Sequence, residues 1–87
     1  MNPNSSSPLH ALRLDIWHLV RRVAQLGSMN KTAADAGLDV GRISSKIRTL
    51  EAELGFEIFR RNPHSVALTA RGTAMLTEIS PLLDQFE

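Results

Sequence analysis

The stretch Asp39–Leu54, which reads DVGRISSKIRTLEAEL, decides the fold of this chain. Its apolar residues recur at steps of four, three and four positions, which is the spacing of one face of an α-helix. They are Ile43, Ile47, Leu50 and Leu54. Asp39 is a candidate N-cap residue, and Gly55 stands where a helix commonly ends. The pattern therefore predicts a helix over residues 40–54 that buries its apolar face.

The opposite face of this predicted helix is small, polar and basic. Its centre carries Gly41, Ser45, Arg48, Thr49 and Ala52, and it is flanked by Arg42 and Ser44. Small side chains let a helix backbone approach DNA closely, while hydroxyl and guanidinium groups reach base edges in the major groove. The face thus favours a recognition helix. The alternative is an ordinary solvated helix face.

Two shorter helical patterns precede this stretch. Apolar residues at three- and four-residue steps predict a first helix over residues 14–26, which ends at Gly27 and places Trp17 in the core. Ser28 then caps a second helix over residues 29–36, and a glycine at position 37 supplies the turn to the third. A helix N-terminus offers unpaired N–H groups to a phosphate. The candidate phosphate contacts are Ser28, Asn30 and Lys31, and simple capping by Ser28 is an alternative that can hold together with this one.

The period of the pattern changes after the third helix. Alternating apolar residues predict a short β-hairpin with strands at residues 57–61 and 65–68. Arg60, Arg61 and His64 flank the turn of this hairpin and are candidates for contacts to the DNA backbone or the minor groove. The alternative is a charged edge strand that discourages aggregation.

A final helix follows, with Thr69 as its cap. Pro81 is expected to kink or split this helix near Ser80. Apolar residues spaced three, four and three along it form a candidate seam between two copies of the chain, namely Leu76, Ile79, Leu83 and Phe86. The chain then divides into a disordered tail at residues 1–11, a winged helix-turn-helix at residues 12–69 and a linker or dimerisation helix at residues 70–87. The fold class is mainly α, with a three-helix core and a short hairpin wing.

Length and composition bound the function. The 87 residues suffice for one small domain, and 43% hydrophobic with 22% charged residues is a soluble globular mix. The chain has no cysteine, and its histidines at positions 10, 18 and 64 are too dispersed for a metal site. No catalytic motif is present, and no apolar run is long enough to span a bilayer. We therefore expect a cytoplasmic protein that is not an enzyme and binds no cofactor.

The charges are unevenly distributed along the chain. Ten Lys and Arg residues against nine Asp and Glu residues give a net charge of +1, which alone does not indicate nucleic acid. From Arg13 to Arg48, however, the only acids are Asp15, Asp35 and Asp39. A near-neutral total can therefore contain a basic face. An evenly solvated surface is the alternative.

From Leu14 to about Leu83, the chain resembles the N-terminal DNA-binding domain of LysR-type transcriptional regulators. Its most specific motifs are Leu50-Glu51-x-Glu53-Leu54-Gly55, then Ile58-Phe59-x-Arg61, and finally Leu68-Thr69-x-x-Gly72. The resemblance implies a bacterial regulator whose winged helix-turn-helix binds double-stranded DNA. It also implies a homodimer formed through the last helix, and a small-molecule effector that binds a separate domain absent from these residues.

The chain departs from the resemblance at the start of the recognition helix. The family commonly has a Ser-Gln-Pro-like start, where this chain has Asp39, Val40 and Gly41. A Gln-type base contact is therefore missing at Val40, although valine can touch a thymine methyl group. Ser44 matches the serine of the family, whereas Ser45 stands where arginine is usual.

These features together predict a sequence-specific DNA-binding domain. The candidate DNA-binding residues are Ser28, Asn30, Lys31, Val40, Gly41, Arg42, Ser44, Ser45, Arg48, Thr49, Arg61 and His64. One alternative is the related winged helix of molybdate-responsive regulators, which residues 34–38 resemble. Another is a winged-helix protein-interaction module, which would expose apolar or acidic residues on the outer face of helix 40–54.

Overall fold

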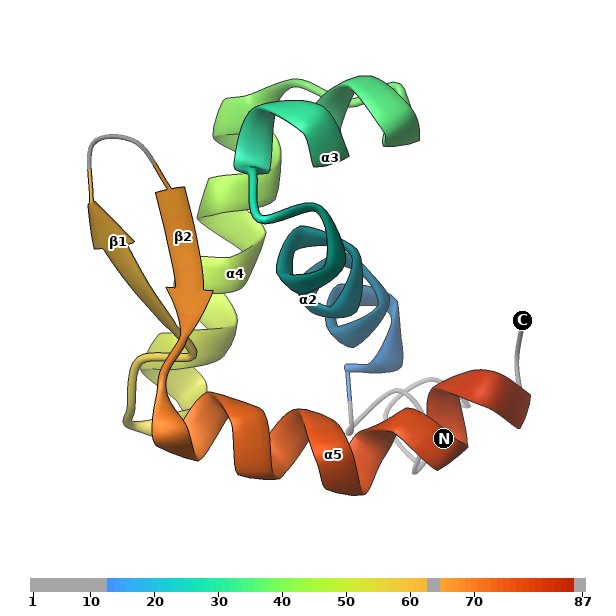
Figure 1. Cartoon of the computed structure of the whole chain (residues 1–87), viewed down its shortest axis with the longest axis vertical. Helices are drawn as coiled ribbons and strands as arrows, with labels where there is room; N and C mark the ends of the chain where they lie inside the picture. The colour runs from blue at the N-terminus through green and yellow to red at the C-terminus, as the bar shows by residue number, and fades with distance from the viewer. Residues whose placement is uncertain (1–12, 63–64, 86–87) are drawn as a thin grey trace, which may run out of the picture.

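The computed structural model describes residues 13–62 and 65–85 and shows helices followed by a hairpin and a last helix (Figure 1). In chain order the elements are α2 (Leu14–Leu26), α3 (Met29–Ala36), α4 (Val40–Leu54), β1 (Phe59–Asn62), β2 (Ser65–Leu68) and α5 (Ala70–Gln85). This order confirms the predicted fold, with α3 and α4 as the helix-turn-helix and with β1 and β2 as the wing. The tail predicted at residues 1–11 lies outside the described residues.

The core lies where α2, α3 and α4 meet, and α5 runs beneath α2 and the base of the wing (Figure 1). The side chains of this core that are at most 3% exposed are Ile16, Trp17, Val20, Val23, Ile43, Ile47, Leu50, Ile58, Phe59 and Leu83. Trp17 is 1% exposed, which confirms its prediction as a core residue. Because α4 turns its apolar side inward here, its small polar side faces solvent.

The turn between α3 and α4 depends on Gly37. Its φ of 67° lies in the left-handed region, which disfavours residues that carry a Cβ atom. Its N–H donates to the carbonyl oxygens of Ala33 and Ala34, and the Leu38 N–H donates to the Ala33 carbonyl at 2.9 Å. These bonds end α3 and fix the direction in which the chain enters α4.

Ser28 caps the other end of α3, as predicted. Its Oγ accepts a hydrogen bond from the Lys31 N–H at 3.1 Å, and its carbonyl accepts one from the buried Thr32 hydroxyl at 2.8 Å. Asp39 occupies the N-cap position of α4, but its side chain makes no capping hydrogen bond. The first turn of α4 is therefore held by the packing of its apolar side and by its backbone.

The wing is an antiparallel pair in which Phe59 lies opposite Leu68 and Asn62 opposite Ser65. The first strand was predicted at residues 57–61, but it begins two residues later and extends to Asn62. The start is later because the N–H group of Ile58 donates to the Glu51 carboxylate instead of to a neighbouring strand. At the turn, Asn62 Oδ1 accepts from the Ser65 N–H at 2.9 Å, which extends the pairing.

The last helix begins at its predicted cap. Thr69 Oγ1 accepts from the Gly72 N–H at 3.0 Å, while the Thr69 hydroxyl donates to the Glu57 carbonyl at 2.6 Å. Of the expected kink or split near Ser80, the split is wrong, because α5 continues through Pro81 to Gln85 as one helix. The buried side chains of Ile79 and Leu83 lie on either side of this proline and anchor both parts of α5 to the core, which compensates for the missing N–H.

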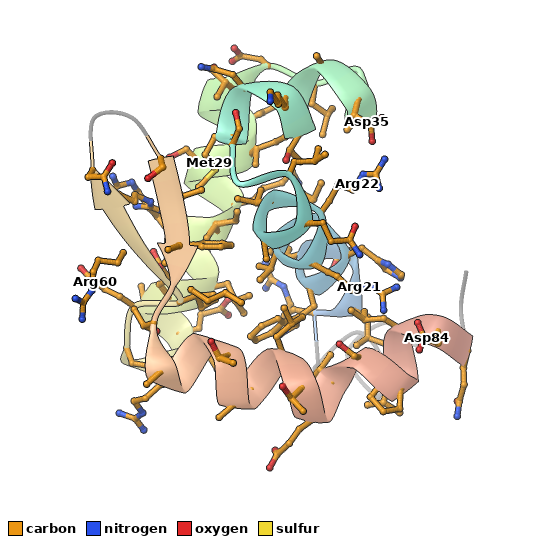
Figure 2. The ribbon with its side chains drawn as sticks, in the orientation of Figure 1. Arg21, Arg22, Met29, Asp35, Arg60 and Asp84 are labelled. Atoms are coloured by element: carbon orange, nitrogen blue, oxygen red, sulfur yellow. The ribbon has the colours of Figure 1, made fainter. Side chains whose placement is uncertain are left out.

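The same burial revises the predicted seam between two copies. Ile79 is 5% exposed and Leu83 is 0% exposed, because both pack inside their own chain. They are therefore not available to a partner while α5 stays docked. Leu76 is half-buried, and Phe86 lies outside the described residues. An ion pair of 2.7 Å between Arg21 and Asp84 further ties the end of α5 to α2 (Figure 2).

Candidate nucleic-acid interface

The outward face of α4 carries most of the predicted base-contacting side chains. Gly41, Arg42, Ser45, Arg48 and Thr49 are all exposed, and Ser44 is half-buried at the edge of the face. Val40 is 37% exposed at the first position of the helix. The Thr49 hydroxyl donates to the Ser45 carbonyl at 3.0 Å, so its oxygen remains able to accept. The structure thus brings these seven predicted residues onto one continuous helical surface.

Several cations form ion pairs with carboxylates among the described residues, so their charge contributes little to attracting DNA. The pairs are Arg13 with Glu53 at 3.4 Å, Arg21 with Asp84 at 2.7 Å, Arg22 with Asp35 at 2.9 Å, and Arg61 with Glu51 at 3.4 Å. Figure 2 shows Arg21 next to Asp84 and Arg22 next to Asp35, both on the α2 side of the molecule. Each pair locally cancels a positive charge against a negative one.

Of the six cations outside these ion pairs, four lie on the helix-turn-helix and the other two lie on β1 and α5. Lys31 on α3, and Arg42, Lys46 and Arg48 on α4, have no ion-pair partner among residues 13–62 and 65–85. We call these four residues the helix-turn-helix cations. They explain how a chain with a net charge of only +1 presents a basic surface.

The start of α3 lies beside the wing. A shallow hollow between the two elements is lined by Gly27, Ser28, Met29, Asn30, Asn62, Ser65 and Val66, and Figure 2 marks Met29 at this junction. The predicted phosphate contacts Ser28 and Asn30 line this hollow. The next residue, Lys31, is exposed. Asn62 and Ser65 were missed as members of this site, because only the folded hairpin brings them next to the α3 N-terminus.

Arg61 is placed differently from its prediction. It lies on β1 with its guanidinium turned to Glu51, and its side chain is 24% exposed. Its Nε is buried and has no partner among the described residues. A guanidinium held by a carboxylate is a poor phosphate contact, so Arg61 serves the fold of the wing. Arg60, the preceding residue, is exposed and points away from the molecule (Figure 2). His64 lies outside the described residues.

Neither a metal centre nor a membrane span emerges from the described residues. Residues 13–62 and 65–85 bring no three His, Asp or Glu side chains into an arrangement that could hold a metal ion. No helix within the same ranges is both long enough and apolar enough to cross a bilayer.

A comparison with known protein families decides the identity of the fold. The profile of bacterial regulatory helix-turn-helix proteins of the lysR family matches residues 14–73, which extend from the start of α2 into the first turn of α5. The chain belongs to the LysR family.

Individual LysR-type relatives agree with this assignment. The HTH-type transcriptional activator AmpR of Providencia stuartii is 32% identical over 78 residues, which cover 90% of this chain and 27% of AmpR. The full-length structure of AphB, the Vibrio cholerae virulence activator, superposes with a TM-score of 0.80 at 30% identity, covering 85% of this chain and 26% of AphB. The chain therefore spans about a quarter of the length of these relatives. The relatives are transcriptional regulators.

A structure solved together with DNA is also similar. The DNA-binding domain of CbnR, crystallised as a complex with DNA, superposes with a TM-score of 0.79 at 26% identity. The match covers 84% of this chain and 84% of the CbnR domain. The likeness includes the wing and α5 as well as the helix-turn-helix, because so large a share of both chains is aligned.

Two residues of the LysR-type motifs have a structural role that the sequence did not reveal. Glu51 accepts hydrogen bonds from the Ile58 N–H at 2.7 Å and the Phe59 N–H at 3.2 Å, in addition to its pair with Arg61. Gly72 packs against the backbone of Ile58 so closely that a Cβ atom there would lie 3.0 Å from the Ile58 carbonyl carbon. Both residues fix the wing to the helices. The sequence marked both residues only as members of the motifs, and a motif does not show which residues its members contact.

Proposed function

We propose that this chain is the sequence-specific DNA-binding domain of a bacterial transcription regulator that acts in the cytoplasm. The recognition helix α4 enters the major groove of double-stranded DNA. The observation that carries this proposal is the concentration of the helix-turn-helix cations on α3 and α4, while ion pairs neutralise Arg13, Arg21, Arg22 and Arg61. The likeness to the CbnR domain, which was crystallised as a complex with DNA, supports DNA as the partner.

The proposed contacts fall into two groups. Val40, Gly41, Arg42, Ser44, Ser45, Arg48 and Thr49 contact base edges, because they share the outward face of α4. Ser28, Asn30 and Lys31 hold the DNA backbone at the N-terminus of α3, whose N–H groups and dipole favour a phosphate. His64 stays a wing contact on sequence grounds alone. A protein-interaction module is less well supported, because Ser, Thr and Arg dominate the α4 face and Val40 is its one large apolar side chain.

We also propose that two copies associate through α5 and thereby bind a two-fold symmetric site. The residues left for this contact are the half-buried Leu76 and Leu82, with Phe86 beyond them. Ile79 and Leu83 support the contact from inside, because they hold α5 against its own core.

The proposal is tested by selecting random double-stranded DNA with this chain and measuring affinity at two salt concentrations. We expect a palindromic sequence to be enriched, and we expect the affinity to fall steeply with salt through counterion release. The slope is about 0.9 per phosphate neutralised on a logarithmic scale, so the four helix-turn-helix cations set an upper bound of about four per half-site, and each cation that contacts a base instead lowers it. Affinity that hardly responds to salt, or no binding at low salt, would exclude DNA as the partner.

Arg48 provides a sharper test within the same assay. Replacing Arg48 with alanine is expected to weaken binding to the selected site by about 1–3 kcal/mol, with a much smaller loss on random DNA, if its guanidinium reads a base. Arg71→Ala is the matched control, because it removes the same charge from α5, where Arg71 stacks on Phe56 at 4.6 Å. Equal losses on selected and random DNA would restrict Arg48 to a phosphate contact.

A further inference from the structure

Val40 is the one large apolar side chain that the described residues leave exposed. It occupies the first position of α4, while the other large apolar residues of this helix pack inward. A β-branched side chain such as valine also has a slightly lowered helix propensity. Neither core packing nor helix propensity therefore accounts for valine at this position.

The surroundings of Val40 indicate what it faces. The preceding residue, Asp39, carries a carboxylate that makes no capping hydrogen bond. A negatively charged group at this point repels phosphate. The following residue, Gly41, has no side chain, and a Cβ atom there would lie 3.3 Å from the Asp39 Oδ2. The leading turn of α4 thus combines an apolar side chain, a carboxylate and an uncovered backbone, and the cations begin only at Arg42.

This chemistry suits base edges rather than the DNA backbone. Among the groups that the four bases present in the major groove, the C5-methyl group of thymine is the apolar one. We propose that Val40 contacts a thymine methyl group and thereby selects thymine at one position of each half-site. This inference rests on the proposed function, since it requires α4 to lie in the major groove.

The experiment removes only the methyl group in question. Each thymine of the DNA site selected by the unchanged chain is replaced in turn by deoxyuridine, which keeps the base pair and lacks the C5-methyl group. We expect one replacement per half-site to weaken binding about fourfold, the effect of exposing one methyl-sized group. Val40→Ala is expected to bind the thymine and deoxyuridine sites equally well, whereas Val40→Ile is expected to keep the discrimination. Because Val40 is exposed, both variants should fold.

The outcomes separate this inference from the proposal on which it rests. A discrimination that Val40→Ala abolishes and Val40→Ile retains would support it. A discrimination that persists in Val40→Ala, or a selected site in which no deoxyuridine replacement matters, would overturn it and leave DNA recognition by α4 intact. Failure to select any DNA sequence would overturn both.

Discussion

Replacing Glu51 with alanine is expected to cost about 3–5 kcal/mol of folding stability, because the change leaves a guanidinium and two N–H groups without their shared acceptor. The side chain of Glu51 is 10% exposed, and its carboxylate binds Arg61, Ile58 and Phe59 together. A domain of this size has a total stability of about 4–13 kcal/mol. The loss is therefore a large share of the whole, and it is measured by urea unfolding with the fluorescence of the buried Trp17.

Two further variants separate the parts of this effect. Glu51→Gln keeps an oxygen for the Ile58 and Phe59 N–H groups but loses the charge that faces Arg61, so we expect a smaller loss of about 1–2 kcal/mol. Glu53→Ala is the matched control, because Glu53 is 50% exposed and pairs only with Arg13 at the surface; its loss should stay below about 1 kcal/mol. Equal losses for Glu51→Ala and Glu53→Ala would show that the Glu51 contacts do not stabilise the wing.

Replacing Gly72 with alanine is expected to destabilise the chain by about 3 kcal/mol or more, at the upper end of the cost of overpacking. A Cβ atom at this position would lie 3.0 Å from the carbonyl carbon and 3.1 Å from the Cα atom of Ile58, and closer still to its oxygen. That backbone is fixed by the Thr69 N–H, which donates to the same Ile58 oxygen at 2.8 Å. The first turn of α5 would have to move away from the wing.

The sign of this effect makes it diagnostic. A glycine to alanine change inside a helix ordinarily stabilises by about 1 kcal/mol. Thr73→Ala, the neighbouring change at an exposed position, should remain within about 0.5 kcal/mol of the unchanged chain. Both variants are compared by thermal unfolding. A stabilised Gly72→Ala chain would mean that α5 does not approach Ile58 as closely as described.

The helices were predictable from the sequence because each has a local signal. The apolar spacing in Asp39–Leu54, with Asp39 before the helix and Gly55 after it, set the bounds of α4 to the residue. The Ser28 and Thr69 caps were likewise readable, since a hydroxyl before a helical pattern serves the helix that follows. The outward face of α4 followed directly, because a helix that buries one side must expose the other.

What the sequence could not show depends on contacts between distant residues. The late start of β1 follows from Glu51, which lies on another element and accepts the hydrogen bond of the Ile58 N–H. Pro81 signals a break locally, but burial of Ile79 and Leu83 overrides it. The same burial could not be predicted from the apolar spacing that suggested the seam, because spacing along α5 does not distinguish packing within one chain from packing between two. The pair between Arg61 and Glu51 was likewise not readable from the sequence, because it joins β1 to α4.

The pairing of acids and cations also has a kinetic consequence. With a net charge of +1, the domain exerts little attraction on DNA beyond the Debye length of about 8 Å at physiological ionic strength. The helix-turn-helix cations act only once α3 and α4 are already close to the duplex. On the proposed function, the domain then forms few long-lived encounters with random genomic DNA, and release from a wrong sequence is fast. Neutralising the cations on the α2 side thus lowers retention on random DNA, in exchange for weaker long-range steering toward the duplex.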